Sequence, residues 1–474
     1  MQNTLTKTNF FLALLCCISA SGVLAQQAPI QYYRPWDQTG INIFEPSKTD
    51  SQPTFDGLKV RFGAAFTQDF QMMTHSNAAV YFPESPSNPV NKNLLYGAGT
   101  GDDGDTTTAQ LNGFTTAMAN LNMDVQLADG IRLSVETYMS TRHHPEFWVK
   151  GGYLQIDKLP MFGNPEWFSK FLRLKVGEFV PNYGDMHFRR SDAGNCIYNP
   201  FVENLVMDAW TTEIGGEVYV FPTEGLTLVA GVTNGQVHGE VKPFSPEPPP
   251  GFADPFQRKP SFLFKASYDK TINELRFRVS GSAYSNSGSE LNSMYLGDRG
   301  GSHYSMVMEQ ARSLLLIDGV PSGIAPSTPA NNKDSGRFLP VVNNQVNSLM
   351  FNGFVKWRDL EFFGTYETMD GRMNFEAEGE TRNFNQIAAE VVYRFLPKDQ
   401  LYVGLKYNTM TGTQLFQDYE ITVNRLAIAA GWFATQNILL KMEYVSQTYE
   451  DFTPFDYQYE GEFSGVTVQA VVGF

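Results

Sequence analysis

Five charged side chains of mixed sign lie close together in one polar stretch of the sequence. They are Asp185, Arg189, Arg190, Asp192 and Glu203. Carboxylates and guanidinium groups at such spacing attract and orient charged solutes, and a pair of arginines facing acids produces a transverse field. An exposed cluster of loop ion pairs is the alternative interpretation. Which interpretation applies depends on the elements that hold this stretch in place.

Other residues with the capacity for chemistry are sparse. The acidic run at 101–105 suits a divalent cation, but it matches no complete calcium-loop pattern. His143 and His144 are adjacent and would point to opposite faces of a strand, which disfavours a shared metal. Cys196 is the only cysteine after residue 25, so no intramolecular disulfide is expected. We expect no metal, no cofactor and no catalytic residue.

The N-terminus has the composition of a secretory signal peptide. Lys7 supplies a positive charge, residues 10–20 form an apolar run, and Ala25 ends a small-residue cleavage site. We expect residues 1–25 to be this signal. Residues 26–56 are then a periplasmic arm or a partial plug, and residues 57–474 form the main domain.

Composition excludes several classes of protein. The chain has 35 Lys and Arg against 50 Asp and Glu, a net charge of −15, which disfavours nucleic-acid binding. Aromatic residues make up 14% of the chain, which argues against disorder. After residue 25 no stretch approaches the ~18 consecutive apolar residues that a membrane-spanning helix requires.

Alternation of apolar and polar residues is the strongest pattern. Between residues 58 and 72, one parity is apolar except for Gln68, and the other is mostly polar. Two further alternating runs flank Asp129-Gly130, which is typical of a hairpin turn. The pattern predicts sixteen strands, at 58–72, 121–127, 131–139, 147–156, 172–180, 210–220, 225–233, 261–269, 274–285, 347–357, 359–367, 386–395, 401–409, 422–433, 438–447 and 461–474.

The connections between these strands alternate between short and long. This alternation, with an even number of antiparallel strands, is typical of a transmembrane β-barrel with short periplasmic turns and long extracellular loops. The prediction is therefore an all-β barrel in the outer membrane of a Gram-negative bacterium, surrounded by outer-membrane lipid. A soluble β-sandwich is the alternative. The connection at 157–171 is too long for a periplasmic turn, so either it contains a short helix or the fourth strand is misassigned.

Strand parity assigns charged residues to the barrel interior. Thirteen basic and nine acidic side chains point inward, a net of +4, in a chain whose total is −15. An aqueous wall with this excess favours anions, whereas pairing of the charges across strands is the alternative. The inward basic residues are Lys59, Arg61, Arg132, Arg173, Lys175, Lys265, Arg276, Arg278, Lys356, Arg394, Lys406, Arg425 and Lys441.

Two segments resemble known outer-membrane proteins. The last strand ends in Phe474 and looks like the signal that such proteins present to the barrel-assembly machinery. Residues 172–181 (LRLKVGEFVP) and 56–63 (DGLKVRFG) are similar to the phosphate-selective porin O and P family. The resemblance implies a sixteen-stranded channel for small hydrophilic solutes, assembled as a homotrimer. It does not imply phosphate selectivity, since no dense arginine ladder is matched.

These observations favour a passive diffusion porin that is weakly anion-selective and not an enzyme. The charged stretch at 182–209 follows the fifth strand, and we expect it to fold inward and constrict the channel. The alternative is a hydrolase in the barrel with a site at the extracellular rim, for which His143, His187, His238 and His303 are candidates. A plugged receptor of about 22 strands would need a longer chain.

Overall fold

The computed structural model describes residues 27–79, 95, 108–141, 144–190, 196–236, 259–289, 291–296, 302–309, 312–317, 320–326, 334–377, 379–415, 417–454 and 456–474. The expected signal peptide at 1–25, the acidic run at 101–105, His143 and Asp192 lie outside these residues.

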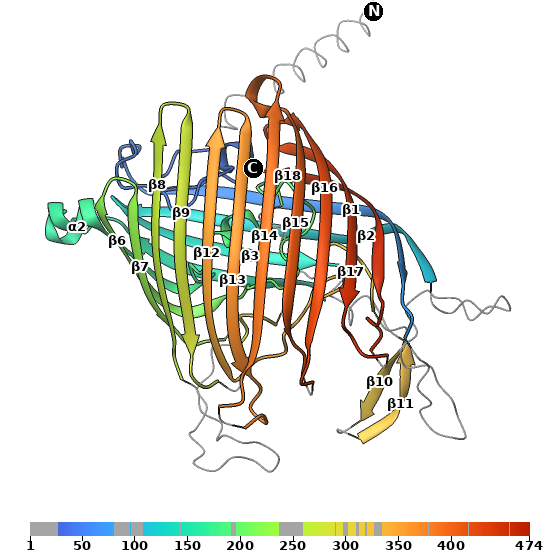
Figure 1. Cartoon of the computed structure of the whole chain (residues 1–474). Coiled ribbons are helices and arrows are strands. Elements are labelled where there is room, and N and C mark those ends of the chain that lie inside the picture. Colours follow the sequence, from blue (N-terminus) through green and yellow to red (C-terminus); the bar gives the residue numbers. More distant parts are fainter. Residues whose placement is uncertain are drawn as a thin grey trace, which may run out of the picture.

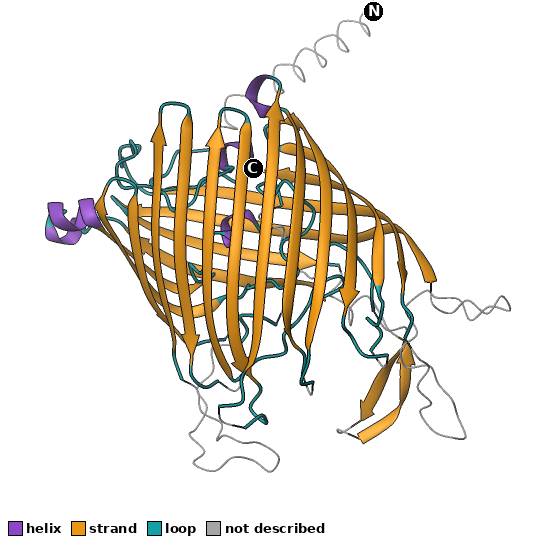
Figure 2. Cartoon of the chain, viewed as in Figure 1, coloured by secondary structure: helices purple, strands orange, loops and turns teal. Residues whose placement is uncertain are grey.

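Sixteen antiparallel strands form one closed barrel (Figures 1 and 2). Each strand pairs with its sequence neighbour, β9 pairs with β12 across the longest connection, and β1 pairs with β18 to close the ring. The strands are β1 (Lys59–Ser76), β2 (Thr108–Ala128), β3 (Ile131–Ser140), β4 (His144–Ile156), β5 (Leu172–Phe179), β6 (Glu213–Thr223), β7 (Leu226–Thr233), β8 (Ser261–Ile272), β9 (Leu275–Asn286), β12 (Gln345–Trp357), β13 (Leu360–Arg372), β14 (Arg382–Phe395), β15 (Leu401–Thr413), β16 (Glu420–Thr435), β17 (Ile438–Glu450) and β18 (Glu462–Gly473).

The predicted sixteen strands therefore correspond one to one with the strands of the barrel. The main difference is β2, which begins thirteen residues earlier than the predicted start at residue 121. Its first half is rich in Thr, Ala and Asn and lacks a clean apolar parity, so pairing with β1 defines it. A second difference is a separate hairpin of β10 (Arg312–Ile317) and β11 (Val320–Pro326) in the long connection.

The connection between β4 and β5 contains two short helical turns. They are η2 (Pro160–Phe162) and the helix α2 (Glu166–Phe171), which projects from the wall in Figure 1. The fourth strand was therefore assigned correctly, and the unusual length of this turn reflects the helix. Trp167 is 59% exposed, so the helix presents an aromatic ring at the end of the barrel where the short turns lie.

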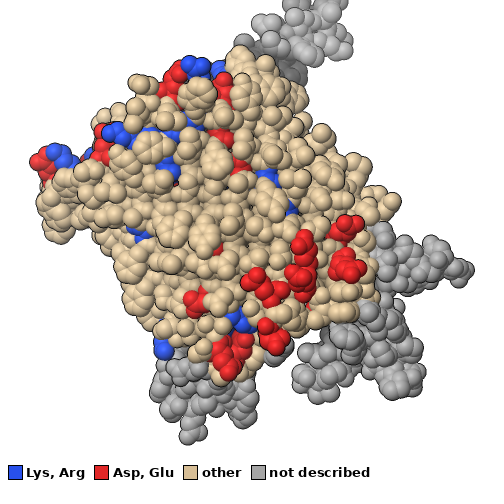
Figure 3. Space-filling view, in the orientation of Figure 1, with Lys and Arg blue, Asp and Glu red and all other residues tan. Residues whose placement is uncertain are grey.

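Burial alternates along the strands as the sequence pattern predicts. On β8 the side chains of Phe262 and Phe264 face outward, whereas Leu263 and Lys265 face inward. The outward residues are predominantly apolar, and Figure 3 shows a largely uncharged middle band with acidic side chains gathered toward the long-loop end. Closure of the sheet leaves no strand edge with unpaired backbone groups, and the apolar exterior suits contact with lipid. The barrel is therefore a transmembrane barrel.

Helices play almost no part in the fold. Among the described residues, no helix combines the length and apolar character needed to cross a bilayer.

At the junction of β1 and β18 the backbone of Phe474 exchanges two hydrogen bonds with that of Ala64, at 3.2 and 3.1 Å. Gly63 and Gly473 lie there against Trp36, and a Cβ at Gly473 would lie 2.3 Å from the Trp36 carbonyl oxygen. The absence of both side chains therefore allows the segment before β1 to lie against the closing strands.

Candidate functional site

Residues 180–212 are called the third loop, and its described parts, 180–190 and 196–212, lie inside the barrel. Their backbone groups bond to wall side chains: Val206 N–H donates to Asn408 Oδ1 at 2.7 Å, and Met207 N–H donates to Gln386 Oε1 at 2.9 Å. Irregular backbone inside a barrel needs such partners because little bulk water reaches it. The polar residues that alternate along β14 and β15 supply them.

The predicted constriction residues lie in this loop but do not form one cluster. Arg278 and Lys265 of the wall hold Asp185, with each closest N–O distance at 2.8 Å. Arg189 contacts Glu390 of β14 at 3.1 Å. The five groups just named are all nearly fully buried, so the loop is tied both to β8 and β9 and to β14 of the wall.

The remaining two described constriction residues pair with loop residues. Arg190 contacts Asp208 at 2.9 Å, within the third loop itself. Glu203 accepts two hydrogen bonds from Arg337, at 2.8 and 3.1 Å, which ties the third loop to the connection between β9 and β12. Burial raises the pKa of Glu203, but the charge and hydrogen bonds of Arg337, together with the charges of His303 and Arg425, lower it to about 2.

Trp210 lies beside Arg190, within the third loop. The sequence pattern predicts it as the first residue of the sixth strand. The strand begins at Glu213, and Trp210 is 3% exposed with its ring 4.9 Å from the Arg190 guanidinium carbon. Its backbone N–H donates to Met294 O at 2.8 Å, so residues 210–212 still belong to the inward loop.

Wall arginines and lysines have two kinds of partner. One group pairs with carboxylates, as Arg132 does with Asp124 and Arg394 with Glu361. A second group holds loop carbonyl oxygens: Lys441 donates to the carbonyls of three third-loop residues at 3.0–3.2 Å. The residues that pair with carboxylates are Arg132, Arg173, Lys175, Arg276, Arg278 and Arg394. Arg425 and Lys441 hold loop carbonyls, and Lys406 has partners of both kinds. The guanidinium group of Arg61 instead stacks on the Tyr33 ring.

Four wall glutamates accept hydrogen bonds from tyrosine hydroxyls, and one of them is Glu217 of β6, to which Tyr219 of the same strand donates at 2.6 Å. Tyr183 and Tyr295, from two different loops, both donate to Glu367, at 3.0 and 2.6 Å. Tyr304 donates to Glu443 at 2.6 Å. The fourth is Glu213, which accepts from Tyr284 at 2.8 Å. Sequence reasoning missed these contacts, although inward-parity glutamates beside tyrosine-bearing polar loops were a usable signal.

The segment before β1, residues 27–56, also lies in the lumen, and we call it the arm. Asn42 donates to Glu361 of β13 at 2.8 Å, and Lys48 contacts Asp157 at 2.9 Å. Burial lowers the pKa of Lys48 to about 8, with Asp157 opposing the shift. These contacts join the arm to buried residues of the barrel.

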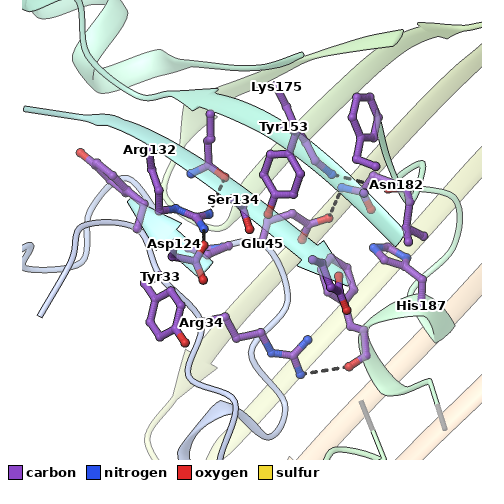
Figure 4. A pocket seen from close by; sticks show the side chains of 18 of the residues that line it. Tyr33, Arg34, Glu45, Asp124, Arg132, Ser134, Tyr153, Lys175, Asn182 and His187 are labelled. Atoms are coloured by element: carbon purple, nitrogen blue, oxygen red, sulfur yellow. Dashed lines mark hydrogen bonds and ion pairs between the residues drawn. The ribbon is translucent and has the colours of Figure 1, made fainter. Parts of the chain in front are cut away.

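Two cavities remain beside the arm. The inner cavity, about 220 Å³, is lined by Arg34 and Tyr33 of the arm, Tyr153 of β4 and His187 of the third loop (Figure 4). Arg34 donates to the carbonyls of Gly40 and Phe188, and its guanidinium carbon lies 3.9 Å from the Tyr198 ring centroid.

The second or turn-side cavity, about 690 Å³, opens among the short turns and is lined by Lys170, Glu224 and Lys270. Phe44, Glu45 and Pro46 of the arm line both cavities. These three residues therefore form the partition between the two spaces.

A thiol, an imidazole and a carboxylate converge elsewhere in the lumen. Cys196 Sγ lies 3.8 Å from His303 Nε2, and His303 Nδ1 lies 2.6 Å from Asp69 Oδ2. The order is that of a nucleophile, base and orienting acid. However, all three side chains are completely buried, and none lines either cavity described above. His187, another residue considered for the hydrolase alternative, lines the inner cavity.

No group of three or more metal-ligating side chains suited to a metal ion occurs in the described parts of the chain.

Comparison with known proteins yields likeness of fold only. No protein-family model matches the chain, and no curated protein matches it in sequence. Solved structures that are similar to this chain include an anion-selective porin from Comamonas acidovorans (9% identity, 88% of this chain and 100% of that chain, TM-score 0.49). Two others are the outer membrane channel DcaP of Acinetobacter baumannii (10%, 89% and 99%, TM-score 0.47) and OmpT, an outer-membrane protein of Vibrio cholerae (8%, 89% and 99%, TM-score 0.46).

Proposed function

We propose that this chain is an outer-membrane porin through which small hydrophilic solutes diffuse passively. The observation that carries the proposal is the combination of an apolar exterior with a lumen lined by charged and polar side chains, in a barrel of sixteen strands. Barrels of this type reside in bacterial outer membranes, and sixteen strands are enough to enclose an aqueous channel. The chain carries out no chemical reaction in this proposal.

The solutes are small. The inner cavity of about 220 Å³ is only moderately larger than the ~150 Å³ that accommodates benzene in an engineered cavity. Loops and arm fill much of the remaining lumen, so the inner cavity admits molecules of about one ring in size. We place the narrow region at the third loop, with Asp185, Arg189, Arg190 and Glu203 contributing the field, and with Asp192 as a further contributor.

Weak anion preference is the finer part of the proposal. Basic residues exceed acidic ones among the inward positions of the strands, and two of them, Arg425 and Lys441, hold loop carbonyls instead of carboxylates. A positive excess in a narrow aqueous space favours entry of anions. Membership of the phosphate-selective porin O and P family, assembly as a homotrimer and recognition of the strand ending at Phe474 by the barrel-assembly machinery belong to the same proposal.

Planar-bilayer recording of the purified chain tests the proposal. Stepwise conductance is expected, and in a salt gradient the reversal potential should have the sign of an anion-favouring pore. Protein boiled in detergent is the control for leakage. Absence of conductance steps would refute the channel, whereas steps with cation selectivity would refute only the anion preference.

A further inference from the structure

Glu45 of the arm occupies a basic site on the barrel wall. Its carboxylate lies 3.2 Å from Lys265 Nζ and 2.8 Å from an Arg278 terminal nitrogen, and it accepts a hydrogen bond from Asn182 Nδ2 at 3.0 Å. Lys265 and Arg278 are wall residues of β8 and β9, and Asn182 begins the third loop. Donors from three elements therefore converge on one carboxylate whose side chain is 3% exposed.

Charge balance at this site depends on Glu45. Asp185 binds the same two basic groups, with Arg278 donating to both of its oxygens at 2.8 Å. Asp269 also lies near, 3.9 Å from Arg278, but Arg276 binds it at 2.7 Å. The negative charges of Glu45, Asp185 and Asp269 balance the positive charges of Lys265, Arg276 and Arg278. Without Glu45 the site carries one net positive charge.

The basic site that holds Glu45 lies at the boundary between the two cavities. Glu45 belongs to the partition between the inner and turn-side cavities. The arm is fixed on both sides of it, by Asn42 to Glu361 and by Lys48 to Asp157. Only the short stretch between these anchors has to move for the carboxylate to leave the site and for the two cavities to join.

We propose that Lys265, Arg278 and Asn182 bind the carboxylate of a small solute, and that Glu45 occupies this site when no solute is bound. The proposal rests on the channel function and names the solute class for it. A tethered competitor has an effective concentration of about millimolar for a short flexible linker, so a free carboxylate competes only at comparable concentration. Exchange of this kind suits a site that must release its solute again.

Binding of acetate to the purified full chain in detergent, followed by saturation-transfer NMR, tests the site without requiring conductance. The variant Glu45→Gln removes the competing charge, and we expect its half-saturating acetate concentration to fall at least tenfold below that of the wild type. The neutral isostere acetamide should bind no better to the variant. The double variant Glu45→Gln with Lys265→Gln should lose the gain.

Controls separate the site from net charge and from folding. Glu166→Gln, on the exposed helix α2, makes the same charge change outside the lumen and should leave acetate binding unaltered. If Glu45→Gln fails to form a barrel, Glu45→Asp retracts the carboxylate by one methylene and should give a smaller fall in the same direction.

Equal acetate binding in the wild type and a folded Glu45 variant, or a gain that survives Lys265→Gln, overturns the proposal. A conducting pore with unaltered acetate binding refutes this site and leaves the channel standing. Improved acetate binding in a protein without conductance refutes the channel and leaves the site standing.

Discussion

Replacement of Glu203 by glutamine should release the third loop from the connection between β9 and β12. Glu203 accepts two hydrogen bonds from Arg337 and one from the His303 N–H at 2.9 Å, and it is completely buried. Glutamine retains the size of the side chain but removes the charge that balances Arg337. Loss of one partner of a buried ion pair typically costs about 3–5 kcal/mol.

The pKa of Glu203 gives an independent magnitude. Its depression from 4.5 to about 2 corresponds, at ~1.36 kcal/mol per unit, to about 3 kcal/mol of stabilisation of the tied loops. Because the folded-state pKa is the lower one, this stabilisation is complete above pH 4.5 and is lost as the pH falls through about 2. At neutral pH a loss of about 3 kcal/mol raises the population of the open loop by a factor of about 10² to 10³.

Amide hydrogen exchange of peptides from residues 197–212 measures this opening. The protected amides of the Glu203→Gln variant should exchange about 10² to 10³ times faster than those of the wild type at neutral pH, provided that exchange occurs through local opening. Peptides from β16 and β17 should be unchanged, and Glu166→Gln is the charge-matched control. Equal loop protection in the variant and the wild type would refute the energetic role assigned to the Glu203–Arg337 pair.

Three further outcomes are expected. Arg189→Gln combined with Arg190→Gln should shift the reversal potential toward cations in bilayer recordings, and an unchanged potential would place both groups outside the ion path. Tyr304→Phe deprives Glu443 of a buried donor and should lower the free energy of local opening by about 1–3 kcal/mol, measured by exchange of the neighbouring loop amides. Removal of Phe474 should reduce the fraction of folded barrel in the outer membrane, assayed by its resistance to unfolding on an unheated detergent gel; normal assembly would contradict the role given to this residue.

The barrel could be predicted from the sequence because a period of two is a local property. On β8 and β15 the outward positions are predominantly apolar and most inward positions carry polar or small side chains, so the alternation of residue types indicates which face each position occupies. The first half of β2 lacks this alternation of apolar and polar residues. Its position follows from pairing with β1, including a bulge between Gln68 and Phe70, which no local pattern contains.

The contacts of the lumen could be predicted only in part. The sequence indicated that Arg189 and Arg190 belong to an inward loop, but not that Glu390 and Asp208 are their partners. Such partners are set by the path of the loop across the lumen, and residues as distant as Glu203 and Arg337 meet there. The arm illustrates the same limit, since nothing near Glu45 in the sequence indicates a wall site some 220 residues later.

The junction between β1 and β18 has a consequence for the order of assembly. It joins Ser76 to Glu462, so its formation closes a loop of nearly four hundred residues. The associated loss of chain entropy is only about 5 kcal/mol on a logarithmic scale, but no earlier pairing can substitute for it. Until the last strand is synthesised, β1 and β17 both present bare edges that lipid cannot satisfy. Without β18 the edges of β1 and β17 lose the partner that joins them, so we expect a chain shortened before β18 to fail to close this sixteen-stranded ring.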